Sequence, residues 1–147
     1  MSGAMKRKHL LAYMRCAEVF AECSTATRLK VGAVLVKDDR ILSVGYNGTA
    51  PGASNDCETV LSDGSTVTRP DVIHAEQNAI YKAARDGQSL LGATMFVTHA
   101  PCIECSKGVL AAGIKRVYYR HAYRSSDGPD FLKSLYVDVE ELRIEDA

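Results

Sequence analysis

The chain has 147 residues and a mass of 15.9 kDa, the size of one domain with its own hydrophobic core. Its 18 Lys and Arg residues balance its 18 Asp and Glu residues. Dedicated nucleic-acid-binding domains typically have a pI above about 9, whereas the pI of this chain is 6.9. Hydrophobic residues at 46% and charged residues at 24% exclude an intrinsically disordered chain. No apolar run approaches the roughly 20 residues of a membrane-spanning helix, and no secretory signal is recognisable. We therefore expect a cytoplasmic protein without nucleic-acid or membrane partners.

The N-terminal half predicts one helix and one hairpin. Apolar residues recur at every third or fourth position between residues 6 and 23, the period of one helix face. The apolar runs 31–36 and 41–46 flank a polar turn and predict two antiparallel strands. Residues 47–72 are rich in Gly, Pro, Ser, Asn and Asp, and a connection this long in one small domain predicts the rim or lid of a site. We interpret residues 1–5 as a remnant of cloning.

The C-terminal half alternates helices and strands. The patterns predict a helix over residues 75–85 and then a strand over 93–98. A second helix over 103–112 and a second strand over 116–120 follow. This order predicts crossover connections between parallel strands, whereas the N-terminal hairpin adds antiparallel ones. Shorter patterns predict a helix at 130–135 and an edge strand at 142–144. We expect one α/β domain over residues 6–147, a three-layer α/β/α fold with a mixed sheet of about five strands.

Two short motifs open the predicted helices of the C-terminal half. The first is His74-Ala75-Glu76, and the second is Pro101-Cys102-Ile103-Glu104-Cys105. An imidazole and two thiolates separated by two residues are suitable zinc ligands, and the positive end of a helix dipole favours the thiolate form. Three protein ligands leave a fourth position for water, as in catalytic zinc sites. Glu76 is placed to carry protons to and from that water, which is the chemistry of hydrolytic deamination.

The remaining cysteines leave a second interpretation of the motifs open. Five cysteines are an odd number, and we expect reduced thiols or metal ligands rather than disulfides. Cys16 and Cys23 lie in the first predicted helix and are expected to be small buried residues. A C-x-x-C motif is also typical of structural zinc sites, in which Cys57 or His99 would complete a closed site in a non-enzymatic binding module.

Taken together, the two motifs are the H-x-E and P-C-x-x-C signature of zinc nucleobase deaminases. From about residue 8 to residue 137 the chain resembles the cytidine deaminase superfamily and, within it, the deoxycytidylate (dCMP) deaminases. Outside the metal motifs, the resemblance lies in the first strand at 31–36, the turn Gly45-Tyr46-Asn47-Gly48 and the segment Ala122-Tyr123-Arg124. It implies a cytidine deaminase-like fold and the hydrolysis of dCMP to dUMP and ammonia, which supplies dUMP for thymidylate synthesis.

The resemblance also implies the residues of the metal centre. One zinc ion per chain would be held by His74, Cys102 and Cys105, with Glu76 as the proton shuttle. Related zinc deaminases that act on dCTP, on a 5-modified dCMP or on another nucleobase remain open alternatives. The partner in every case is a small nucleotide or nucleobase compound.

For the substrate, the resemblance places Asn47 at the deoxyribose and adds Ala75 as a further contact. It places Ser24, Arg28 and Tyr123 at the 5′-phosphate. A guanidinium suits a phosphate dianion, and a tyrosine offers a stacking face and a hydroxyl.

The resemblance further implies a homo-oligomer, with a hexamer favoured over smaller assemblies. Gly45, Tyr46, Asn47 and Gly48 are then a candidate effector site for dCTP and dTTP, bound with Mg²⁺. The alternative is purely conformational, because glycine permits a positive φ and asparagine tolerates it.

Overall fold

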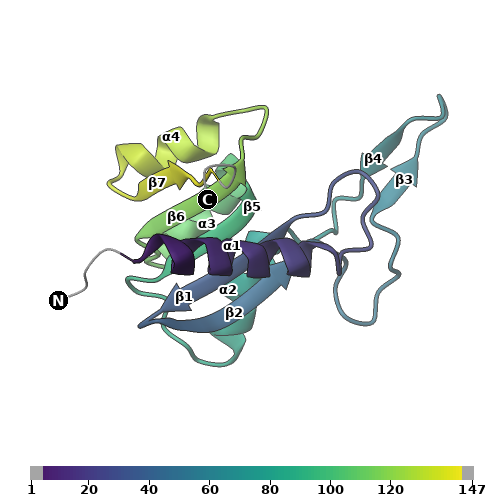
Figure 1. The fold of residues 1–147 in the computed structure, drawn as a ribbon. Coiled ribbons are helices and arrows are strands. Elements are labelled where there is room, and N and C mark those ends of the chain that lie inside the picture. Colours follow the sequence, from purple (N-terminus) through teal and green to yellow (C-terminus); the bar gives the residue numbers. More distant parts are fainter. Residues whose placement is uncertain (1–4, 144–147) are drawn as a thin grey trace.

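The computed structural model describes residues 5–143 and has a five-stranded mixed sheet between two layers of helices (Figure 1). The predicted α/β/α architecture is confirmed. The helices are α1 (Arg7–Ala21), α2 (Ala75–Arg85), α3 (Ile103–Ala111) and α4 (Asp127–Ser134). The strands are β1 (Gly32–Lys37), β2 (Arg40–Tyr46), β3 (Glu58–Val60), β4 (Thr66–Thr68), β5 (Thr94–His99), β6 (Arg116–His121) and β7 (Asp138–Glu141). Within residues 5–143, none of these helices combines the length and apolar character needed to cross a membrane.

The sheet has the strand order β2-β1-β5-β6-β7. β1 is antiparallel to both β2 and β5, whereas β5, β6 and β7 run parallel to one another. The parallel strands are joined by α3 and α4, as the helix–strand alternation predicts. The carboxyl end of β5 therefore leads directly into the segment that opens α3.

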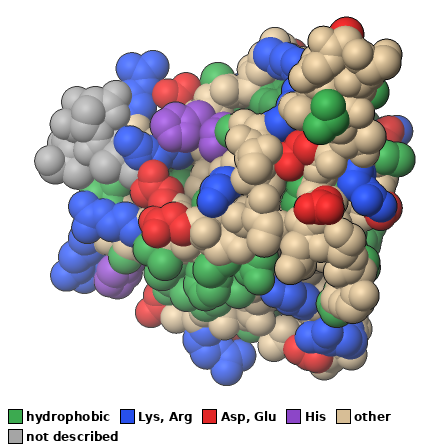
Figure 2. All heavy atoms as spheres, turned by 90° about the vertical axis from the view of Figure 1, so that its right-hand side faces the viewer, with side chains coloured by type: hydrophobic (Ala, Val, Ile, Leu, Met, Phe, Trp, Pro, Cys, Tyr) green, Lys and Arg blue, Asp and Glu red, His purple; other side chains and the backbone are tan. Residues whose placement is uncertain are grey.

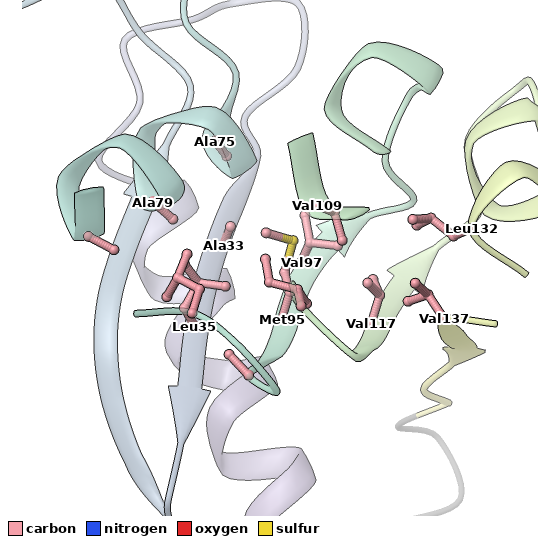
Figure 3. Close-up of a cluster of buried hydrophobic side chains, with 14 residues drawn as sticks. Ala33, Leu35, Ala75, Ala79, Met95, Val97, Val109, Val117, Leu132 and Val137 are labelled. Atoms are coloured by element: carbon pink, nitrogen blue, oxygen red, sulfur yellow. The ribbon is translucent and has the colours of Figure 1, made fainter. Parts of the chain in front are cut away.

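Both faces of the sheet are buried, so β1 is apolar along nearly its whole length. Val34 and Val36 point to the α1 side, where they pack with Met14 and Phe96. Residues of the opposite parity face the layer of α2, α3 and α4 (Figure 3). That second core contains Ala33, Leu35, Ala75, Ala79, Met95, Val97, Val109, Val117, Leu132 and Val137, among others.

Gly45 allows β2 to lie unusually close to α2. A Cβ atom at Gly45 would overlap the Ala75 carbonyl oxygen and lie 2.6 Å from the Ala79 nitrogen. Gly48, by contrast, has nothing within 4 Å of such an atom. Neither glycine has a positive φ, so the expectation that this turn needs glycine for a left-handed backbone is wrong. Gly45 is required for close helix–strand packing rather than for a left-handed backbone.

The outer edge of β2 is covered by side chains from α2. Lys82 Nζ donates to the Val44 carbonyl at 3.0 Å, and Asn78 Nδ2 donates to the Tyr46 carbonyl at 2.8 Å. Since β2 is the first strand of the sheet, these carbonyls would otherwise face solvent.

Four features differ from the expectations. The last strand is Asp138–Glu141 rather than 142–144; Leu142 follows it, and Ile144 lies outside the described residues. The connection 47–72 contains the β3–β4 hairpin, which projects from the body of the molecule (Figure 1). Cys23 is exposed and Cys16 only half-buried, so the expectation that both are buried is wrong. The predicted short helix at 130–135 exists but begins earlier, at Asp127.

Candidate active site

The metal motifs meet where α2 and α3 begin. His74 is the residue before α2, Cys102 the residue before α3, and Cys105 lies in the first turn of α3. The Gln77 side chain accepts a hydrogen bond from the His74 backbone N–H at 3.0 Å, which fixes the start of α2. The Cys105 backbone N–H points at Cys102 Sγ, 3.4 Å away. Two helix N-termini thus present the imidazole and both sulfurs to one point.

The distances between these three side chains suit a tetrahedral zinc ion. His74 Nδ1 lies 3.2 Å from Cys105 Sγ and 3.7 Å from Cys102 Sγ, and the three ligand atoms lie within 4.8 Å of one another. Ordinary zinc–sulfur and zinc–nitrogen bond lengths at tetrahedral angles place such atoms about 3.6 Å apart. The donor set, one imidazole and two sulfurs, therefore fits zinc in both chemistry and spacing.

The two sulfurs have opposite protonation tendencies. Hydrogen bonds from Cys105 and His74 lower the pKa of Cys102 to about 4, so Cys102 is a thiolate at neutral pH. Cys105 donates to Cys102 and is buried, and both effects raise its pKa. Because a zinc ligand must be a thiolate, binding zinc here displaces a proton from the pair.

Glu76 lies in the first turn of α2 with only 5% of its surface exposed. Burial raises the pKa of Glu76 to about 7, although the nearby His74 acts in the opposite direction. A carboxyl group with a pKa near the working pH can both accept and donate a proton. Its position two residues after a metal ligand makes it suitable for proton transfer beside the metal.

A cavity of about 450 Å³ opens over this cluster. It is bounded by the segment before β1, the β3–β4 hairpin, the start of α2, the loop before α3 and the segment after β6. Acidic and basic side chains are interspersed on the face of the molecule seen from the hairpin side (Figure 2). The residues that line the cavity include Arg28, Asn47, Cys57, Glu58, Thr68, His74, Ala75, Glu76, His99, Cys102, Tyr123 and Arg124.

Of the residues predicted to contact substrate, Arg28, Asn47, Ala75 and Tyr123 line the cavity. Ser24 is buried behind its wall: the Ser24 hydroxyl donates to the Asn47 carbonyl at 2.7 Å and accepts from the Ala26 N–H at 3.1 Å. In this structure Ser24 supports the wall and does not face the cavity.

Asn47 joins the cavity wall to the backbone before β1. Its Oδ1 accepts from the Val31 N–H and its Nδ2 donates to the Leu29 carbonyl, both at 2.8 Å. The side chain retains one amide hydrogen and one oxygen lone pair for a ligand. The residue therefore combines a structural role with a free hydrogen-bonding capacity at the cavity.

A family model described as the cytidine and deoxycytidylate deaminase zinc-binding region matches residues 7–121. The chain belongs to this family. It is 36% identical to ComE operon protein 2 of Bacillus subtilis over 147 residues, covering 97% of this chain and 70% of the relative. It is 41% identical to the deoxycytidylate deaminase of Mycobacterium phage D29, covering 73% and 90% of the two chains. A crystal structure of the dCMP deaminase from cyanophage S-TIM5, in complex with dCMP and dUMP, has a TM-score of 0.87 and 49% identity, covering 94% and 99%.

Membership of a family whose model describes a zinc-binding region, together with the ligand geometry, makes this cluster the candidate zinc site of the chain. Cys57 and His99 do not join the cluster formed among the residues that the structure describes. Cys57 packs with Ala26 and Val72, and His99 Nδ1 lies 2.9 Å from Thr98 Oγ1. Neither residue is therefore placed as the fourth ligand of a closed structural site.

The sequence predicts no role for three polar residues that line the cavity of the deaminase, Arg124, Glu58 and Thr68. Arg124 follows Tyr123 directly, and its guanidinium carbon lies 5.5 Å from the Tyr123 ring centroid, a cation–π contact. Its presence in the segment 122–124, part of the resemblance, was an available signal. Glu58 and Thr68 come from the β3–β4 hairpin, which no apolar pattern reveals.

Proposed function

We propose that this chain is a zinc-dependent deoxycytidylate deaminase, which converts dCMP and water into dUMP and ammonia. One observation carries the proposal: a single cavity is lined by the metal ligands His74 and Cys102, by Glu76, and by the cations Arg28 and Arg124. A nucleotide deaminase needs these two chemistries side by side, one for the base and one for the phosphate. The likeness to the cyanophage enzyme with bound dCMP and dUMP supports the same substrate here.

The chain's own residues supply the proton transfers. His74, Cys102 and Cys105 would hold a zinc ion, which would supply Lewis-acid activation of water at neutral pH. Glu76 takes a proton from the attacking water and delivers it to N3 of the base, and it then carries the remaining hydroxyl proton to the exocyclic nitrogen, so that the bond between C4 and that nitrogen breaks. Oxygen remains on C4 and the nitrogen leaves as ammonia. The burial of Glu76 excludes bulk water from this exchange.

The rest of the cavity suits a deoxyribose 5′-phosphate. Arg28 and Arg124 offer guanidinium groups, and Tyr123 offers a hydroxyl, for the phosphate oxygens. The free capacity of the Asn47 amide serves the deoxyribose. Ala75 is the first residue of α2, where the backbone N–H has no partner within the helix and can donate to the substrate.

A panel of substrates tests the proposal. We expect ammonia release from dCMP to exceed that from deoxycytidine at least tenfold in kcat/KM, because a charged hydrogen bond to the phosphate contributes about 1.5 to 3 kcal/mol. The panel includes dCTP and 5-methyl-dCMP, whose preferred use would assign the enzyme to a neighbouring specificity. Equal use of nucleoside and nucleotide would remove the phosphate assignment. Efficient deamination of an anticodon stem-loop RNA would contradict the deoxycytidylate assignment itself.

We also propose that the enzyme is a homo-hexamer under effector control. The candidate effector segment Gly45–Gly48 lies at the end of β2, where Tyr46 is half-buried with Lys82 Nζ 5.8 Å from its ring centroid. Lys82 provides a cation near the segment for the phosphates of dCTP or dTTP, with Mg²⁺ sharing their charge. Nucleotide metabolism places such an enzyme in the cytoplasm, where its dUMP supplies thymidylate synthesis.

A further inference from the structure

Glu58 is a carboxylate in the wall of a cavity that we assign to an anionic substrate. It lies in β3, is half-buried and lines the same cavity as Arg28 and Tyr123. A negative charge beside a phosphate dianion weakens binding by Coulomb repulsion. The charge of Glu58 alone would therefore weaken substrate binding.

The hydrogen bonds of Glu58 connect it to the backbone of the segment that carries Arg28. Its Oε2 accepts from the Thr27 N–H at 2.9 Å and from the Arg28 N–H at 3.2 Å. Desolvation raises the pKa of Glu58, but these hydrogen bonds outweigh it and leave the pKa lowered, so the group is a carboxylate at neutral pH. One oxygen atom of the hairpin thus holds two successive backbone amides of the segment that carries Arg28.

That segment has no regular structure of its own, since residues 24–31 form neither helix nor strand. The hairpin and its approach hold it at further points on both sides of Glu58. Thr25 Oγ1 donates to the Asn55 carbonyl at 2.9 Å, and Ala26 packs against Cys57. The Arg28 guanidinium donates to Thr68 Oγ1 at 3.3 Å, from the second strand of the hairpin. Both the backbone and the side chain of Arg28 therefore take their position from the hairpin.

We propose that Glu58 is a positioning residue for the 5′-phosphate, acting through Arg28. The inference rests on the proposed function, because it assumes that Arg28 binds the phosphate. Two effects of the carboxylate then oppose each other: its hydrogen bonds hold Arg28 in place, whereas its charge repels the ligand. The positioning effect is the larger one, since an unheld arginine in an irregular segment loses much of its directed hydrogen bonding.

Substitutions of Glu58 and Thr68 can separate the effect of the hydrogen bonds from the effect of the charge. Glu58→Ala removes both the hydrogen bonds and the charge, and we expect it to raise KM for dCMP about tenfold with kcat nearly unchanged. Glu58→Gln keeps an oxygen that can accept from both amides and removes only the charge, and we expect its KM to equal or fall below that of the wild type. Thr68→Val removes only the contact to the guanidinium and should raise KM in the same direction by a smaller factor.

Binding provides a readout that needs no turnover. Isothermal titration with dUMP and with deoxyuridine should show that Glu58→Ala weakens dUMP binding about tenfold and changes deoxyuridine binding by less than about twofold. Asp63→Ala is the matched control: this carboxylate lies at the tip of the same hairpin, bonds only to Ser65 among the described contacts and should leave both affinities unchanged.

Two results would overturn the inference. Tighter binding of dUMP by Glu58→Ala would mean that the carboxylate acts by repulsion alone, and equal losses for dUMP and deoxyuridine would mean that it supports the whole cavity. Failure of the proposed function looks different, because the wild-type protein itself would then not distinguish dUMP from deoxyuridine. Thermal melting of each variant distinguishes unfolding of the protein from loss of the position of Arg28. If Glu58→Ala unfolds, Thr68→Val still tests the inference.

Discussion

Glu76 is separated from His74 by a single residue, yet its carboxylate is assigned to proton transfer and not to the metal. We expect Glu76→Ala to lower kcat for dCMP by at least about 100-fold, the loss typical of removing an acid–base group, while zinc stays bound. Ammonia release and zinc content measured on the same preparation check both halves of this statement. Activity near the wild-type level would contradict the mechanism, and loss of zinc would make Glu76 part of the metal centre.

Cys102 and Cys57 both line the cavity, but only Cys102 belongs to the metal cluster. We expect Cys102→Ala to lose zinc on desalting against a chelator, because two remaining ligands do not hold the ion. Cys57→Ser should retain zinc, since Cys57 Sγ contacts Thr25 Oγ1 at 3.4 Å and packs in a separate small cluster. Zinc release from Cys57→Ser would restore the closed structural site as an interpretation.

Some residues of the candidate site lie in short sequence motifs, whereas others reach the site only through contacts between distant segments. His74, Glu76 and the two cysteines of the C-x-x-C motif lie within short motifs, and the sequence predicts them because ligand spacing and helix starts are local properties. Glu58 enters the site through a strand pairing across the hairpin, which no local pattern indicates. Spacing alone did not distinguish Arg28 from the other basic residues; only a family resemblance did.

At the scale of elements, the contact between β2 and α2 controls the position of the metal ligand and of Glu76. Gly45→Ala would press a methyl group against the carbonyl oxygen of Ala75, the residue between His74 and Glu76. We expect the free energy of unfolding to fall by about 1 to 3 kcal/mol, the usual cost of forcing an extra carbon into a packed contact. Urea denaturation of the wild type and of Gly45→Ala measures this difference in the free energy of unfolding.

Gly48→Ala is the matched control for this packing effect, because a methyl group there meets nothing within 4 Å and φ is not positive. We expect its stability to stay within about 0.5 kcal/mol of the wild type. Equal destabilisation by the two substitutions would show that the segment as a whole, and not the approach of β2 to α2, sets the stability.

Elements with a buried face are the ones that the sequence predicts well. α1, α2 and the strands β1, β5 and β6 follow their apolar periods to within a few residues. β3 and β4 were missed because most of their side chains are exposed, so no alternation marks them. The sequence predicts the last strand a few residues too late, because β7 itself is rich in acidic residues. The apolar Leu142 beyond it is buried and resembles a strand position.

For the whole molecule, assembly and control are tested together. Light scattering should give a mass near six chains. Rates against dCMP should be sigmoidal alone, hyperbolic with dCTP and Mg²⁺, and shifted to higher substrate concentration with dTTP, because an effector that prefers one state shifts the equilibrium between states. Hyperbolic rates indifferent to both nucleotides would remove the regulatory proposal and leave the catalytic one intact.

The covered edge of β2 has a consequence for how chains can aggregate. An open edge strand is a template on which a foreign strand adds, the first step of domain swapping and of amyloid growth. The Val44 and Tyr46 carbonyls on that edge are already paired with α2 side chains, and an added strand would have to displace them. The opposite edge, β7, carries Asp138, Glu140 and Glu141, whose charges repel an identical strand. We therefore expect concentrated solutions of the folded protein to resist conversion to fibrils that bind thioflavin T.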